Sequence, residues 1–124
     1  MRKPYSFSAR LRSFQYAFAG IGMLLKSQHN AWIHALATVI VIGAGFCFRV
    51  AADEWCWLVL AIMAVWSAEA MNTAFEFLAD AASPGFHPLV KHAKDVAAGA
   101  VLLAAIGAAV IGLLVFAPYL MGQA

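Results

Sequence analysis

The stretch WCWLVLAIMAVWSAEAMNTAFEFLAD, residues 55–80, combines two properties that seldom occur together. Its first half is almost wholly apolar, whereas its second half carries Glu69, Asn72, Glu76 and Asp80. An α-helix rises 1.5 Å per residue, so about 20 residues cross a hydrocarbon core about 30 Å thick. We therefore predict a membrane-spanning helix with polar side chains toward one end.

The rest of the chain has the same apolar character. Of the 124 residues, 65% are hydrophobic and 11% are charged, which is far from the balance of a soluble domain. Two further apolar runs can each cross once, and the turn-rich SPGFHP at residues 83–88 must end the helix before it. We expect a single all-α integral membrane domain over residues 1–124, with spans at about 30–48, 55–80 and 93–120.

The segment before the first span, about residues 6–27, has apolar side chains at helical spacing with basic residues among them. It predicts an amphipathic helix on the cytoplasmic leaflet, although Gly20 and Gly22 weaken it and an ordinary basic lead-in stays open. Basic residues gather before the first span, and the positive-inside rule therefore predicts a cytoplasmic N-terminus. These residues are Arg2, Lys3, Arg10, Arg12 and Lys26.

The polar residues of the second span share one face. At 100° per residue, Glu69, Asn72, Glu76 and Asp80 fall within about 80° of arc. Glu69 lies about 21 Å from Trp55 along the helix, still inside the membrane, where a carboxylate costs several kcal/mol and indicates a functional site. The alternative is that the amide and carboxylate join helices by hydrogen bonds.

The third span begins with HAKDV, which adds Lys94 and Asp95 at the same end of the membrane. Taken alone, Asp95 would simply stabilise the helix N-terminus through the helix dipole, and Lys94 would extend its ammonium group to the membrane surface. Beside the polar stripe they indicate a Mg²⁺ and phosphate site, because carboxylate oxygens bind Mg²⁺ and a lysine neutralises phosphates. No GxxxxGK[ST] loop and no glycine-rich kinase loop occurs. A small ion- or proton-conducting membrane protein is the competing hypothesis.

Three motifs carry a family resemblance: EAMNTAFEFLAD at residues 69–80, SPGFHPL at 83–89 and AKDVAAGAV at 93–101. With them the chain resembles the prokaryotic diacylglycerol kinases, a family that includes the undecaprenol kinases. The resemblance implies a homotrimer in the bacterial inner membrane, with three spans and a surface helix per subunit. It further implies transfer of the γ-phosphate of Mg·ATP to a lipid hydroxyl, and no nucleic-acid partner.

The resemblance also implies roles for individual residues. Glu69 would be the general base on the lipid hydroxyl, Asn72 would support phosphate transfer, and Glu76 would bind the metal. The remaining polar residues would serve the nucleotide and its phosphates: Asp80, Lys94 and Asp95.

The chain departs from the family pattern at Gln28, where a glutamate commonly joins the metal site. An amide oxygen can still bind Mg²⁺, but the lost charge should weaken binding. A non-catalytic membrane scaffold derived from such a kinase therefore also stays open. The run HALA at residues 34–37, and an alanine instead of serine at position 98, are more like the undecaprenol kinase branch than the diacylglycerol-specific one.

Overall fold

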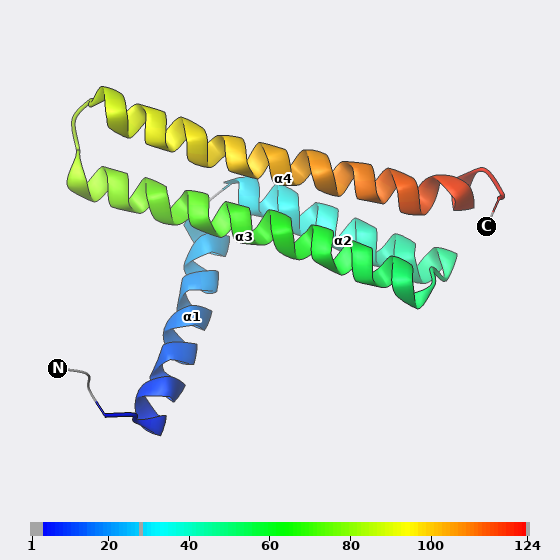
Figure 1. Ribbon diagram of the computed structural model, residues 1–124, viewed down its shortest axis with the longest axis horizontal. Coiled ribbons are helices and arrows are strands. Elements are labelled where there is room, and N and C mark those ends of the chain that lie inside the picture. Colours follow the sequence, from blue (N-terminus) through cyan, green and yellow to red (C-terminus); the bar gives the residue numbers. More distant parts are fainter. Residues whose placement is uncertain (1–3, 28, 124) are drawn as a thin grey trace.

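The computed structural model describes residues 4–27 and 29–123, and for His29 the backbone only. These residues form four helices: α1 (Phe7–Ser27), α2 (His29–Phe48), α3 (Ala52–Ala82) and α4 (Pro88–Leu120). Helices α2, α3 and α4 run alongside one another as a bundle, and α1 projects away across the bundle axis (Figure 1). The predicted all-α architecture is confirmed.

Three of these helices are long and apolar enough to cross a membrane, as the sequence predicts. They are Asn30–Phe48, Ala52–Ala82 and Pro88–Leu120. The α3–α4 turn lies at one end of the bundle, and α1 approaches the start of α2 partway along α3, on the side toward that turn (Figure 1). The α2–α3 turn and the C-terminus lie at the opposite end, so the polar half of α3 shares its end of the bundle with α1.

Helix α4 begins five residues before residue 93, the predicted start of the last span. Helix α4 starts at Pro88, whose fixed φ suits the first helical position, and the His87 side chain accepts a hydrogen bond from the Leu89 N–H. The predicted linker therefore ends at His87, and Pro88 begins a helix. Helix α3 ends where expected, because Ser83 is followed by Pro84 and Gly85.

A cluster of buried apolar residues lies at the end of the bundle opposite the polar stripe. Val50, Leu58 and Val115 are buried there, with aromatic side chains packed around them. Close helix approach requires a glycine at position 45, because a Cβ there would overlap the ring of Trp55. This contact joins α2 to the start of α3.

Replacing Gly45 by Ala is expected to lower the free energy of unfolding by about 1–3 kcal/mol, because the added methyl forces the Trp55 ring to move. Gly43→Ala on the same helix is the matched control, since its Cβ would meet no atom within 4 Å. Denaturant titration in detergent micelles measures both. Equal unfolding midpoints for the two variants would show that the close approach at Gly45 does not limit stability.

Most large apolar side chains of the described residues lie on the outside of the single chain. Trp32, Leu102 and Leu113 are examples, each more than half exposed. A soluble monomer rarely exposes large contiguous apolar patches, so these faces need lipid or another subunit to cover them. Helix α1 contacts the bundle through Leu24, its one buried residue among those described.

Candidate functional site

Glu69 is the most deeply placed carboxylate of the polar stripe. Its side chain is 0% exposed, and its Oε2 lies 3.2 Å from Nε2 of His34 on α2. Its second oxygen, Oε1, is buried and has no hydrogen-bond partner among the described residues. A buried charge of this kind is costly unless it is paired, so one oxygen is stabilised by His34 and the other lacks the donor that its burial calls for.

Asn72 lies one turn further along α3 and is also buried, with its Oδ1 unpartnered within the described chain. Together with Glu69 it lines a pocket of about 280 Å³ between α2, α3 and α4. Asn30 and Ala98 line the same pocket from α2 and α4. Two residues that line this cavity therefore each carry a buried acceptor oxygen without a donor in the described chain, which suits a ligand that donates a hydrogen bond.

The remaining predicted residues lie nearer the end of the bundle. Asp80 is about 16 Å from Glu69 along α3, and its Oδ1 lies 3.2 Å from the Lys94 ammonium on α4. Half-buried Glu76 lies between these two levels, about 10 Å from Glu69 along the helix. The stripe thus runs from a buried carboxylate to an exposed ion pair that links α3 to α4.

Asp95 does not face the stripe in the single chain. Its Oδ2 lies 2.6 Å from the Lys91 ammonium, one turn before it on α4, and both side chains are exposed. Gln28 lies outside the described residues.

No three His, Cys, Asp or Glu side chains gather to hold a metal ion within residues 4–27 and 30–123. Mg²⁺ is commonly held by one or two carboxylates together with substrate phosphates, and a single stripe carboxylate such as Glu76 fits that arrangement.

His34 is the residue that the sequence reasoning did not assign to the site. A histidine on an apolar span is expected to be a packing or interfacial residue, yet His34 contacts Glu69, 35 positions later in the sequence. Its ring also lies edge-on to Trp66, with centroids 6.2 Å apart. The signal in the sequence is that His34 is the only His, Asp, Glu, Lys or Arg in the apolar run 31–48, because such residues usually face a partner inside a membrane.

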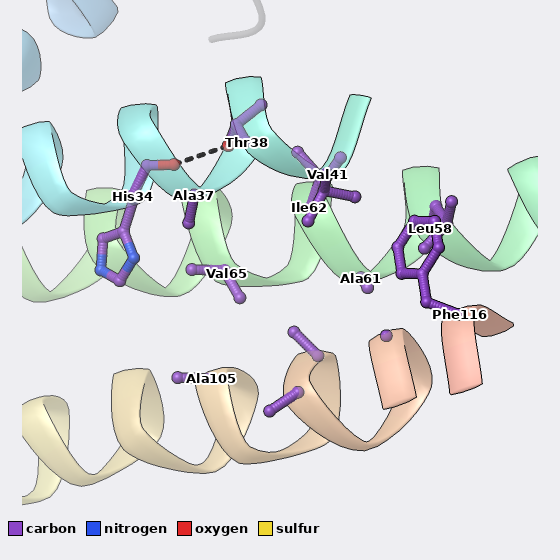
Figure 2. A pocket seen from close by; sticks show the side chains of 13 residues that line it. His34, Ala37, Thr38, Val41, Leu58, Ala61, Ile62, Val65, Ala105 and Phe116 are labelled. Atoms are coloured by element: carbon purple, nitrogen blue, oxygen red, sulfur yellow. Dashed lines mark hydrogen bonds between the residues drawn. The ribbon is translucent and has the colours of Figure 1, made fainter. Parts of the chain in front are cut away.

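An apolar groove of about 280 Å³ begins at His34 and runs along the three spans toward Phe116 (Figure 2). Small side chains form much of its wall, including Ala37, Ala61 and Ala105. The groove and the Glu69 pocket share His34 and Ala105 in their linings. A hydrocarbon-lined space therefore adjoins the buried carboxylate.

Comparison with known proteins identifies relatives over most of the chain. The family model described as prokaryotic diacylglycerol kinase matches residues 15–116. An undecaprenol kinase of Bacillus subtilis is 39% identical over 109 residues, which are 88% of this chain and 89% of that protein. A diacylglycerol kinase of Synechocystis is 42% identical over 103 residues, covering 82% of this chain and 59% of the relative.

Proposed function

This chain belongs to the prokaryotic diacylglycerol kinase family and is a lipid kinase; on that premise we propose that it transfers the γ-phosphate of Mg·ATP to the hydroxyl of undecaprenol. The observation that carries the proposal is Glu69, a fully buried carboxylate with one oxygen paired to His34 and the other unpartnered within the described chain. It faces a pocket that adjoins a hydrocarbon-lined groove. A lipid hydroxyl with an apolar chain matches both features.

In the proposed reaction Glu69 is the general base. Its Oε1 takes the proton from the lipid hydroxyl while the hydroxyl oxygen forms a bond to the γ-phosphorus of ATP. The bond between that phosphorus and the bridging oxygen breaks, and ADP leaves with the bond electrons. Asn72, which lines the same pocket, supports the transferring group through its side-chain amide.

The nucleotide occupies the shallower part of the stripe in this proposal. Lys94 neutralises phosphate charge, and Asp80 holds its ammonium at 3.2 Å. Glu76 would hold Mg²⁺, which would shield the charge of the phosphates, and Gln28 is proposed as a further ligand. Asp95 would serve the nucleotide. The order of the residues along α3 supports these separate sites for lipid and nucleotide. Glu69 is buried at the level of the lipid, and the ion pair between Asp80 and Lys94 is exposed to water.

We further propose a homotrimer in the bacterial inner membrane, with the N-terminus, α1 and the α3–α4 turn on the cytoplasmic side. The direction of α1 across the bundle axis suits a helix that lies along the membrane surface (Figure 1). The exposed apolar faces of the spans supply surface for subunit contacts. ATP is then available from the same side as Lys94 and Asp80.

Ala98 supports undecaprenol over diacylglycerol as the preferred lipid. It lines the Glu69 pocket and offers a methyl group, whereas a serine there would offer a hydroxyl to a glycerol backbone. Both lipids carry one free hydroxyl, but undecaprenol lacks the ester carbonyls of diacylglycerol and so needs no second polar partner. Diacylglycerol remains the second candidate, because one relative is a diacylglycerol kinase.

Replacing Ala98 by Ser is expected to shift selectivity toward diacylglycerol by about threefold to tenfold, the worth of one hydrogen bond. The measurement is competition between diacylglycerol and a polyprenol for labelled γ-phosphate in bicelles. Wild-type protein should label the polyprenol more. Stronger labelling of diacylglycerol by the wild-type protein would reverse the proposed preference, and an unchanged ratio in the variant would remove Ala98 from it.

A further inference from the structure

His34 contacts Glu69 in a way that separates the two oxygens of this carboxylate. An ionised carboxylate only accepts hydrogen bonds, so a Glu69 able to act as base must receive a hydrogen from Nε2 of His34 across the observed 3.2 Å. The contact occupies Oε2, and Oε1 stays buried without a partner among the described residues. Oε2 is therefore already hydrogen-bonded, and Oε1 is the oxygen that can accept a proton.

The His34 ring is held at this point by its neighbours. Its side chain is 16% exposed, and Trp66 of α3 packs edge-on against it with ring centroids 6.2 Å apart. The backbone near His34 is tied to α3 as well, because Trp66 donates to the Thr38 hydroxyl at 2.9 Å and Thr38 donates to the His34 carbonyl at 2.7 Å. The imidazole is fixed relative to the helix that carries Glu69.

We propose that His34 is the positioning residue for Glu69: its Nε2–H holds Oε2 and thereby presents Oε1 to the acceptor hydroxyl. The inference rests on the proposed function, in which Glu69 is the base. His34 carries no proton to or from substrate in this account and acts only through Glu69. Partners that orient a functional group in this manner typically change activity by about 10- to 100-fold when removed.

The test compares kcat and KM for His34→Gln and His34→Asn in bicelles with Mg·ATP and undecaprenol. Glutamine keeps an N–H donor at a similar reach, whereas asparagine is shorter and leaves Oε2 without its donor. We expect kcat within about threefold of wild type for glutamine and a fall of about 10- to 100-fold for asparagine, with KM for ATP unchanged. Equal kcat values in the two variants would overturn the inference.

Tyr119→Phe is the matched control, because it removes a hydrogen bond between two spans, from Tyr119 of α4 to Glu54 of α3, while keeping the aromatic ring. Its kcat should stay within about twofold of wild type. A loss as large as that of His34→Asn would assign the effect to helix packing and contradict a role through Glu69.

A second comparison shows whether His34 acts through Glu69. Glu69→Asp shortens the side chain and withdraws the carboxylate from His34, so adding His34→Asn to it should lower kcat by less than threefold. A further loss as large as in the wild-type background would contradict the inference. Wild-type turnover in Glu69→Gln would instead contradict the proposed role of Glu69 as base. If Glu69→Gln is inactive and His34→Asn is fully active, only the His34 inference is contradicted.

Discussion

Glu69→Gln is expected to lower lipid phosphorylation by about 10²- to 10⁴-fold, the usual contribution of a general base. The amide keeps the size of the side chain and an oxygen that can accept from His34 at the observed position, so the fold should survive. It cannot take a proton from the lipid hydroxyl. The measurement is kcat with saturating Mg·ATP and undecaprenol. The affinity for ATP is measured as well and should be the same in the variant and the wild type.

The matched control for this prediction is Glu54→Gln. Glu54 is a second carboxylate of α3, at the opposite end of the bundle, where Tyr119 donates to its Oε1 at 3.0 Å and its Oε2 is buried without a partner in the described chain. Its loss should leave turnover within about twofold. A folded Glu69→Gln variant with wild-type kcat would remove Glu69 from the chemistry.

Lys94→Met is expected to lower kcat/KM for ATP by about 10²- to 10³-fold. A single donor aimed at developing charge contributes about this much, and Lys94 brings a positive charge one turn from the Ala98 wall of the Glu69 pocket. If Lys94 only tied α4 to Asp80, its loss would cost little, because exposed ion pairs contribute about 0–1 kcal/mol. Steady-state kinetics with varied ATP separates these outcomes.

Lys91→Met serves as the control for the lysine prediction. Lys91 forms an exposed pair with Asp95 at 2.6 Å on the same helix, and it lies one turn further from the pocket than Lys94. Its removal should change kcat/KM for ATP by about twofold or less. Equal losses in the two lysine variants would indicate that only the general positive charge near this end of the bundle matters.

The spans and the polar stripe could be predicted because both depend on local periodicity. A run of about 20 apolar residues fixes a crossing, and a 100° turn per residue places Glu69, Glu76 and Asp80 on one face. Helix α4 begins ahead of residue 93, the predicted start of the last span, because Pro88 belongs to the helix as well as to the turn-rich sequence before it. Proline is also favoured at the first helical position, where its missing N–H has no intrahelical partner to lose.

The contacts of the site were harder to predict because they depend on how the helices pack. The distance between His34 and Glu69 is set by the register of α2 against α3, which no motif encodes. The pairing of Asp95 with Lys91 had a local signal, since residues four apart on a helix face each other. The direction of α1 across the bundle depends on tertiary contacts such as the packing of Leu24, and periodicity within α1 does not determine it.

The central claim is that a carboxylate within the membrane directs the γ-phosphate of ATP onto a lipid hydroxyl. Its most direct test offers the purified protein undecaprenol in bicelles with Mg·ATP labelled at the γ-phosphate, and in parallel at the α-phosphate. We predict γ-label in the lipid, α-label in ADP, and one ADP for each phosphorylated lipid. Unlabelled lipid from a folded protein, or γ-label released only as inorganic phosphate, would contradict the account.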